Sequence, residues 1–315
     1  MREIRILFMG TPDFAVESLA QIIAAGFTVV GVVTAPDRPA GRGRKLQQSA
    51  VKKYALTQNL KILQPTNLKS DSFQEELQAL NPTLQVVVAF RMLPEKVWRF
   101  PKYGTFNLHA SLLPEYRGAA PINWAVINGE KISGVTTFFI DEKIDTGAII
   151  NSKKIEIAPS ETVGTVHDRL MKIGGELIVS TIKQIESGEV KTTAQNKELE
   201  EKPAPKLSKE NTKIDWSKPI LNIYNLIRGL NPYPAAWCIL ENNEKSLKVK
   251  IFDCEMALAE TNETPGTVSI EDKTLKISAI DGYLFIKEIQ LPGKRKMKVK
   301  DLLNGLTLSE DAKMR

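Results

Sequence analysis

Short apolar runs and amphipathic stretches alternate along the first half of the chain, and the apolar runs are continuous over residues 29–33 and 86–89. The apolar runs are typical of buried strands, and they cover residues 4–8, 29–33, 84–90 and 105–108. Stretches with helical spacing lie near residues 16–25, 49–57, 72–80 and 121–128. This alternation predicts a doubly wound, Rossmann-like α/β domain with a mostly parallel sheet, whose functional site lies at the carboxyl ends of the strands.

The pattern changes in the second half. Two apolar stretches, 135–140 and 149–157, precede a long helix-like stretch over 163–185, and a polar segment with Pro203 and Pro205 then reads as a semi-rigid linker. After a helix-like stretch, short strand candidates follow at 237–240, 247–253, 267–270, 275–280 and 284–289. Many short strands separated by turn residues predict a small antiparallel β-barrel of the OB-like class. We therefore expect a Rossmann-like domain over 1–188, a linker over 189–207 and an OB-like barrel over 208–315.

Positive charge is concentrated in one stretch. The chain has 315 residues and a formal net charge of +6, yet no Asp or Glu occurs from residue 38 to residue 70. The cations of this stretch are Arg38, Arg42, Arg44, Lys45, Lys52, Lys53, Lys61 and Lys69. A run with one sign of charge fits either a solvated surface or a surface that binds a polyanion.

The sequence lacks the motifs that mark several classes of protein. The two cysteines, Cys238 and Cys254, have no metal-ligand spacing, and we expect no metal site. No signal peptide and no apolar run of about 20 residues is present, so we expect a cytoplasmic protein that does not enter a membrane. There is no phosphate loop and no nucleophile elbow.

The candidate chemistry rests on an amide, an imidazole and a carboxylate. The chain has two histidines, His109 and His167, and His109 follows Asn107 by two residues at the end of an apolar run. In a strand these two side chains share a face, where an amide donor and an imidazole can stabilise an oxyanion and move a proton. The same residues also fit a solvated strand end, and Asp145 in Asp-Thr-Gly fits an ordinary turn. His167 fits a surface or packing role.

The stretches 107–114, 116–122, 134–136 and 145–147 resemble, in this order, the folate-dependent formyltransferases. Those enzymes place an Asn-x-His pair on a strand end and an Asp about 36 residues later (here 145 − 109 = 36). The resemblance implies that Asn107, His109 and Asp145 are catalytic and that 10-formyltetrahydrofolate is the formyl donor, leaving as tetrahydrofolate. The residues it implies for folate binding are Ser111, Leu112, Leu113, Pro114, Arg91, Met92 and Leu93.

Three further stretches are similar to the branch of this family that formylates methionyl-initiator tRNA. They are residues 10–14, residues 36–43, and residues 206–209 with 214–216. This similarity implies a monomeric enzyme of translation initiation that contacts tRNA through Arg38, Arg42, Arg44 and Lys45. A second basic strip, residues 294–300, fits either a tRNA-backbone contact or an ordinary solvated edge strand.

Two alternatives stay open at this point. Asn123-Trp124 is closer to the amino-sugar relatives, which favours an amino sugar or another small amine as acceptor. A non-catalytic RNA-binding protein on the same scaffold is a further alternative, against which the intact set of Asn107, His109 and Asp145 argues.

Overall fold

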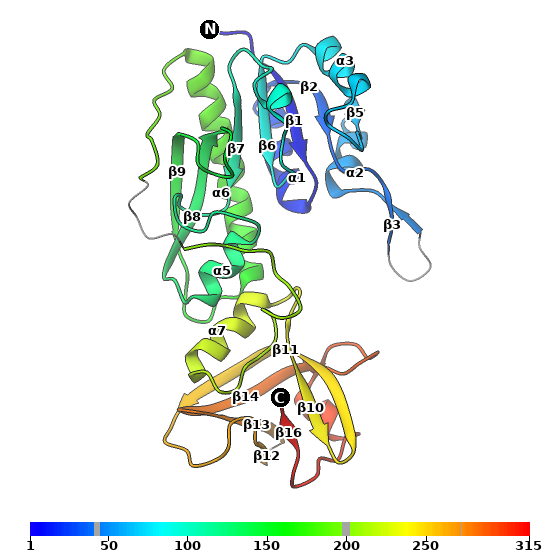
Figure 1. Cartoon of the computed structure of the whole chain (residues 1–315), viewed down its shortest axis with the longest axis vertical. Helices are drawn as coiled ribbons and strands as arrows, with labels where there is room; N and C mark the ends of the chain where they lie inside the picture. The colour runs from blue at the N-terminus through cyan, green and yellow to red at the C-terminus, as the bar shows by residue number, and fades with distance from the viewer. Residues whose placement is uncertain (41–44, 197–201, 272) are drawn as a thin grey trace. The chain divides into compact units, whose positions relative to one another are not determined.

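The structure is a computed structural model, and it describes residues 1–40, 45–196, 202–271 and 273–315 (Figure 1). The chain forms two compact units. The first, here called the N-terminal unit, comprises Met1–Pro121, Ser133–Ile155 and His167–Pro203. The second, the C-terminal unit, comprises Ile122–Ile132, Glu156–Val166 and Ala204–Arg315. Each unit is therefore built from more than one stretch of sequence.

A seven-stranded sheet in the order β5-β2-β1-β6-β7-β8-β9 forms the centre of the N-terminal unit. Its strands are β1 (Arg5–Gly10), β2 (Thr28–Val33), β5 (Ile62–Leu63), β6 (Leu84–Val88), β7 (Thr105–His109), β8 (Ile132–Phe139) and β9 (Ile149–Glu156). The pairings from β5 through β7 are parallel, whereas β8 runs antiparallel to β7. The parallel part confirms the predicted Rossmann-like fold.

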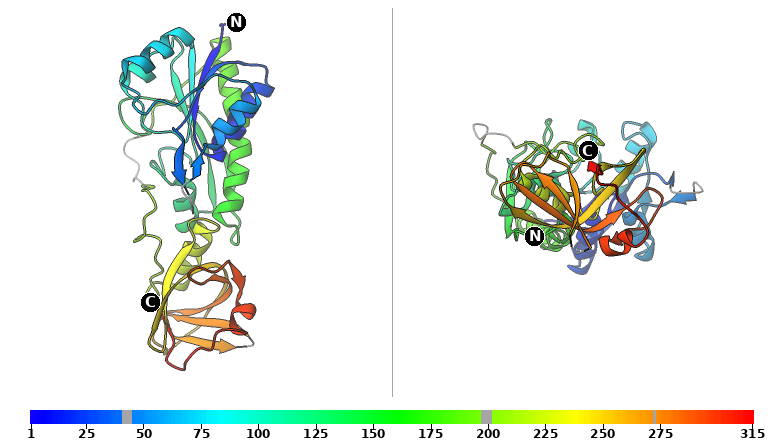
Figure 2. Two further views of the ribbon diagram at one scale, coloured as in Figure 1. Left: turned by 90° about the vertical axis from the view of Figure 1, so that its right-hand side faces the viewer. Right: turned by 90° about the horizontal axis from the view of Figure 1, so that it is seen from below.

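Helices cover both faces of this sheet (Figure 2). They are α1 (Asp13–Ala24), α2 (Ala50–Thr57), α3 (Asp71–Leu80), α4 (Glu95–Trp98) and α6 (Val163–Ser187). The helix α5 (Pro121–Ile127) belongs, from Ile122 on, to the C-terminal unit. Leu7 and Met9 of β1 pack with Phe73 of α3 in one core cluster. Because strand side chains alternate, the equally buried Ile6 and Phe8 face the opposite layer.

A short hairpin that the apolar pattern did not predict leaves the sheet after β2. It consists of β3 (Arg38–Ala40) and β4 (Lys45–Gln47). Asp37, directly before it, accepts hydrogen bonds from Lys52 Nζ at 2.6 Å and Gln64 Nε2 at 2.8 Å, and these contacts hold the pKa of Asp37 below its ordinary value. Lys52 is thus paired with an acid.

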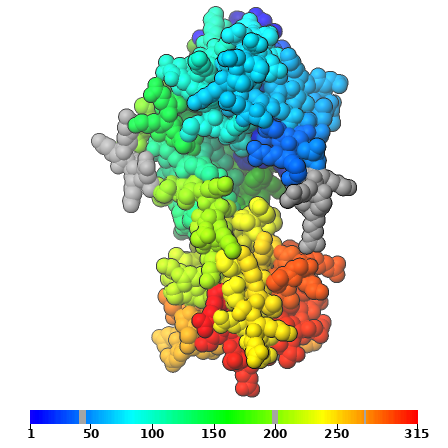
Figure 3. Space-filling model, turned by 45° about the vertical axis from the view of Figure 1, so that its right-hand side comes forward, coloured from blue at the N-terminus to red at the C-terminus, as the bar shows by residue number. Residues whose placement is uncertain are grey.

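The C-terminal unit contains an antiparallel, nearly closed β-barrel in the order β12-β13-β14-β11-β10-β16, with β15 beside β14. The strands are β10 (Ala236–Asn242), β11 (Lys245–Leu258), β12 (Val268–Glu271), β13 (Thr274–Ala279), β14 (Gly282–Gln290), β15 (Met297–Lys298) and β16 (Lys313–Met314). A bridge between Thr267 and Lys313 joins the two ends of this order, which confirms the predicted barrel. Figure 3 shows the β10–β11 hairpin, in yellow, across one exposed face of the unit.

Two helices belong to the barrel. The helix α7 (Ile220–Leu230) places Ile220, Ile223 and Ile227 in the barrel core, at the i, i+3, i+7 spacing of an apolar helix face. The basic strip over 294–300 is not one edge strand, because β15 is followed at once by α8 (Val299–Leu303). Within this strip Lys296 is paired with Glu288 at 2.6 Å.

Candidate active site

Strand β7 carries the amide and the imidazole to the carboxyl edge of the sheet. Because β6 and β7 are parallel and Val88 pairs with Leu108, the loops that follow both strands leave at the same edge. Asn107 and His109 share a face of β7 by strand alternation. The half-buried Asn107 amide makes no side-chain hydrogen bond to any other described residue, so its N–H groups are available to a ligand.

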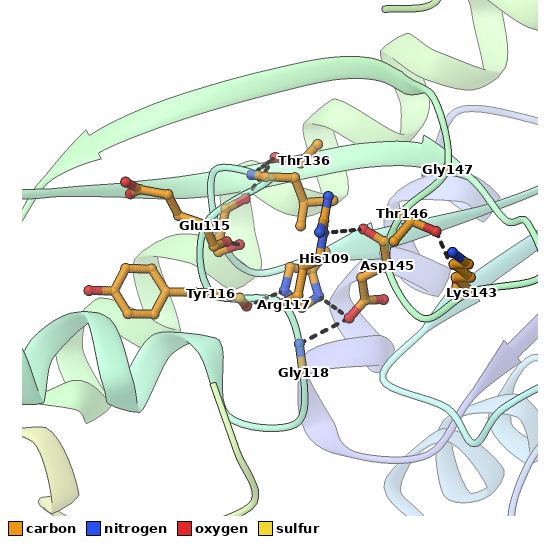
Figure 4. A network of polar contacts seen from close by, with 12 residues as sticks. His109, Glu115, Tyr116, Arg117, Gly118, Thr136, Lys143, Asp145, Thr146 and Gly147 are labelled. Atoms are coloured by element: carbon orange, nitrogen blue, oxygen red, sulfur yellow. Dashed lines mark hydrogen bonds and ion pairs between the residues drawn. The ribbon is translucent and has the colours of Figure 1, made fainter. Parts of the chain in front are cut away.

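His109 is held in one orientation. Its side chain is only 6% exposed, and Nε2 lies 2.7 Å from the main-chain oxygen of Tyr116. Because a carbonyl oxygen only accepts, Nε2 must carry a hydrogen, and the neutral ring then has its lone pair on Nδ1. Nδ1 faces the Asp145 carboxylate, with 3.7 Å between Nδ1 and Oδ2 (Figure 4). The Tyr116 carbonyl therefore holds the ring with its Nδ1 edge toward Asp145.

Asp145 is fixed through both its carboxylate and its backbone. Oδ2 accepts a hydrogen bond from the Gly118 N–H at 3.1 Å, and the carboxylate is 15% exposed. The main-chain oxygen of Asp145 accepts from Arg117 Nε at 3.1 Å and from Gln195 Nε2 at 2.9 Å. The residue has a φ of 56°, a left-handed conformation that is uncommon for a residue with a side chain.

Gln195 lies in this site although nothing in the sequence pattern marks it. It is 8% exposed, and its Oε1 accepts from Arg117 Nε at 3.2 Å and Nη2 at 2.7 Å. Its Nε2 also donates to the main-chain oxygen of Gly147 at 2.8 Å. The residue lies in a polar segment, 50 positions after Asp145, where composition predicts a linker.

The loop after β7 is stabilised by its own hydrogen bonds. Thr136 on β8 pairs with His109, donates to the Ser111 carbonyl at 2.7 Å and accepts from the Leu113 N–H at 3.2 Å. The Ser111 hydroxyl donates to the Glu115 carbonyl at 2.7 Å, so this side chain stabilises the conformation of the loop. Leu113 is buried, whereas the neighbouring Leu112 and Pro114 are half-buried. Backbone groups and these apolar side chains are what the loop can offer to a ligand.

The loop after β6 has both buried and exposed side chains. Leu93 is buried in the core, while Met92 is 71% exposed. Arg91 donates to the Thr66 carbonyl at 2.9 Å and also to the Pro65 carbonyl. Burial lowers the pKa of Arg91, and the nearby positive charge of Arg38 lowers it further.

The residues expected to contact tRNA are only partly described. The side chain of Arg38 on β3 is exposed, and Lys45 is the first residue of β4. Arg42 and Arg44 lie outside the described residues.

The described ranges contain no helix that is long and apolar enough to cross a membrane, and no group of three or more His, Cys, Asp or Glu side chains arranged to hold a metal ion. Cys238 and Cys254 are both free and buried. Burial raises the pKa of the Cys238 thiol to about 12 and also raises that of Cys254. Both groups therefore remain protonated and unreactive at neutral pH.

Sequence relatives share the whole length of the chain. The family model of formyl transferase matches residues 3–182, and that of the formyl transferase C-terminal domain matches residues 206–307. A protein named methionyl-tRNA formyltransferase from Flavobacterium johnsoniae is 55% identical over 314 residues, which is 100% of both chains. One of the same name from Bacteroides thetaiotaomicron is 50% identical over 318 residues, covering 99% of this chain and 98% of that protein.

Solved structures share the fold at lower sequence identity. HypX from Aquifex aeolicus in complex with tetrahydrofolic acid aligns with a TM-score of 0.64 at 18% identity, over 96% of this chain and 47% of that one. An N-formyltransferase from Helicobacter canadensis, in complex with folinic acid and dTDP-3-aminofucose, aligns with a TM-score of 0.64 at 23% identity, over 90% of this chain and 98% of that one. With matches to both family models and full-length relatives at 50–55% identity, the chain belongs to the formyl transferase family.

Proposed function

We propose that the chain transfers the formyl group of 10-formyltetrahydrofolate to the free amino group of methionyl-initiator tRNA, the reaction that prepares this tRNA for translation initiation. The observation that carries this function is an identity of 50–55% over the full chain with relatives named methionyl-tRNA formyltransferase. Both the domain with the Asn-His-Asp site and the barrel are included in that match.

The reaction sets clear chemical demands. The amine nitrogen attacks the formyl carbon, a C–N bond forms, and the carbonyl oxygen becomes an oxyanion. The bond from the formyl carbon to the folate nitrogen then breaks, and that nitrogen leaves as an amine. One proton must pass from the attacking nitrogen to the leaving nitrogen. The site therefore needs an oxyanion donor and a group that accepts and returns a proton.

The geometry supports a specific role for each of the three polar residues. Asn107 donates from its free amide to the oxyanion, and a donor of this kind contributes about 3–4 kcal/mol to transition-state stabilisation. His109 accepts the proton at Nδ1, the ring nitrogen that is not occupied by Tyr116, and returns it to the leaving nitrogen. The Asp145 carboxylate, 3.7 Å from Nδ1, stabilises the positively charged imidazolium while the ring carries the proton.

Folate binding is assigned to the two loops that leave the same edge of the sheet. In the first loop, Leu112 and Pro114 present apolar surface, while Ser111 and Leu113 maintain its shape. The residues assigned in the second loop are Arg91, Met92 and Leu93, of which Arg91 and Met92 are exposed. Buried Leu93 supports the loop from the core.

The remaining assignments concern tRNA, location and assembly. Residues 1–188 catalyse the reaction, residues 189–207 link the domains and the barrel of residues 208–315 binds tRNA together with Arg38, Arg42, Arg44 and Lys45. The protein acts in the cytoplasm as a monomer, and its two free cysteines fit a reducing compartment. Light scattering at assay concentration tests the monomer.

A formylation assay tests the function directly. The purified chain is expected to formylate methionyl-initiator tRNA with 10-formyltetrahydrofolate and to leave a nucleotide-linked amino sugar unmodified. Turnover of the sugar without turnover of the charged tRNA would replace the first function with the alternative. The full-length relatives named methionyl-tRNA formyltransferase favour the charged tRNA over the sugar. Asn123 donates to the Gly229 carbonyl at 2.8 Å and Trp124 Nε1 to the Pro205 carbonyl at 2.7 Å. These two side chains stabilise the C-terminal unit.

Removal of cations between residues 38 and 45 is expected to weaken the binding of charged tRNA. Arg42→Ala, alone or with Arg38→Ala, should raise the KM for charged tRNA about tenfold and reduce the steepness with which activity falls as salt increases. Each phosphate contact releases counterions, so fewer contacts give a smaller salt slope. Steady-state kinetics from 50 to 200 mM salt measure both effects.

The matched control is Lys183→Ala, which removes an exposed cation from α6, away from the hairpin. It should leave the KM and the salt slope within twofold of the parent values. An unchanged slope in the Arg42→Ala and Arg38→Ala variants would exclude these two arginines from tRNA binding.

A further inference from the structure

We propose that Gln195 is a positioning residue for catalysis, which acts by holding the Asp145 carboxylate beside His109. Gln195 lies between the two matched family models, which end at residue 182 and begin at residue 206. The inference rests on the proposed function, because it concerns the same site and the same reaction. It assigns a chemical task to a segment whose composition alone indicates only a linker.

The Gln195 amide makes the full number of hydrogen bonds available to it. Nε2 donates to the main-chain oxygens of Asp145 at 2.9 Å and Gly147 at 2.8 Å, and Oε1 accepts twice from Arg117. An amide has two donor hydrogens and two acceptor lone pairs, so all four are used. Buried polar groups that are fully paired define one geometry, and removal of one partner leaves the others unsatisfied.

These bonds act on the residue whose position matters most for His109. Asp145 has a φ of 56°, and a residue with a side chain stays in this conformation when its surroundings hold it there. Its main-chain oxygen is held by both Gln195 and Arg117, which fixes the orientation of the peptide. The carboxylate is thereby directed at the Gly118 N–H, 3.1 Å away, and at His109.

The chain before Gln195 is anchored to the sheet. Thr193 and Ile149, the first residue of β9, exchange two main-chain hydrogen bonds of 2.8 Å each. This pair brings Gln195 back to the Asp145–Gly147 loop, which directly precedes β9. The neighbouring Thr192 is exposed, so the segment buries Gln195 selectively.

Gln195→Ala is expected to lower kcat for formylation about tenfold while the KM for 10-formyltetrahydrofolate stays within twofold. Gln195→Glu should lose at least as much, because at neutral pH it presents a carboxylate to two carbonyl oxygens in place of two N–H donors. Gln195→Glu nearly preserves the side-chain volume, so it also carries the test if Gln195→Ala does not fold. Thr192→Ala is the matched control and should retain the parent kcat. Parent-like kcat in both Gln195 variants would overturn the proposal.

A double-mutant cycle separates positioning from a general structural role. If Gln195 acts through the Asp145 carboxylate, Gln195→Ala in an Asp145→Ala background should change kcat by less than twofold. The same tenfold loss in both backgrounds would show that Gln195 acts independently of that carboxylate, and the proposal would be wrong. A parent chain that does not formylate charged tRNA would instead contradict the proposed function, and this role with it.

Discussion

Replacement of His109 by alanine is expected to lower kcat for formyl transfer by roughly 100-fold or more, with little change in the KM for 10-formyltetrahydrofolate. The imidazole carries the proton between the two nitrogens, and its charge develops in the transition state rather than in the bound substrate. Asn107, the neighbouring polar residue on the same strand face, has no titratable group and cannot replace the imidazole in this step. Single-turnover measurement with charged initiator tRNA separates this loss from slow product release.

The chain offers a matched control in its other histidine. His167 on α6 is 37% exposed, contacts the Phe14 ring edge-on at 5.2 Å and lies 3.0 Å from Asp168. His167→Ala should therefore keep kcat within about twofold. If His109→Ala retained near-parent turnover, the proton would have to move through another group, and the role assigned to Nδ1 would be wrong.

The parallel core of the sheet could be predicted from the sequence because its chemistry is local. β6 lies between two neighbouring strands under helices on both faces, which explains the continuous apolar run Val86–Val88 in its sequence. The barrel strands were predicted for a different local reason, since short apolar runs such as Trp237–Leu240 are separated by turn residues. In β10, buried and half-buried residues alternate along Ala236–Asn242, as expected for a strand with one face in the core.

Strand direction and very short elements could not be predicted in the same way. An apolar run has the same pattern in either direction, so nothing local shows that β8 runs antiparallel to β7. The hairpin β3–β4 has three residues in each strand and stands outside the main sheet, without the apolar periodicity that marks the other strands. Its anchor, Asp37 with Lys52, is a contact between residues 15 positions apart.

In the candidate site, too, local features could be predicted from the sequence and long-range contacts could not. The i, i+2 spacing of Asn107 and His109 is a property of one strand, and it could be predicted from strand geometry alone. The approach of Asp145 to His109 depends on the connection from β8 to β9, and the resemblance to a known family indicated it. Gln195 had no signal of either kind. Its Nε2 donates to backbone oxygens, which almost any sequence supplies, and its partner Arg117 lies 78 positions away in the chain.

The substitution Gly147→Ala is expected to be as damaging as the loss of a catalytic side chain. A Cβ at this position would lie 1.7 Å from the main-chain oxygen of Phe139, far inside any allowed contact, and the blocking atom belongs to the backbone of β8. Phe139 also donates its N–H to the Ala148 carbonyl at 3.0 Å, so the two segments cannot separate without loss of this bond. The loop must therefore move, and Asp145 moves with it. We expect a loss of roughly 2–4 kcal/mol in the free energy of unfolding and a fall of about 100-fold in kcat.

Gly26→Ala provides the control that separates steric clash from backbone strain. Gly26 has a φ of 82°, but no atom lies within 4 Å of the position its Cβ would take. Its replacement should cost about 1 kcal/mol from backbone strain alone and leave kcat unchanged.

Urea unfolding and single-turnover kinetics of both variants give the comparison. If Gly147→Ala lost only as much stability as Gly26→Ala and kept its kcat, the close approach of β8 to the Asp-Thr-Gly loop would not be needed for catalysis. If kcat falls in Gly147→Ala alone, the glycine of Asp-Thr-Gly is required because it lets the strand pass close enough to hold Asp145 beside His109.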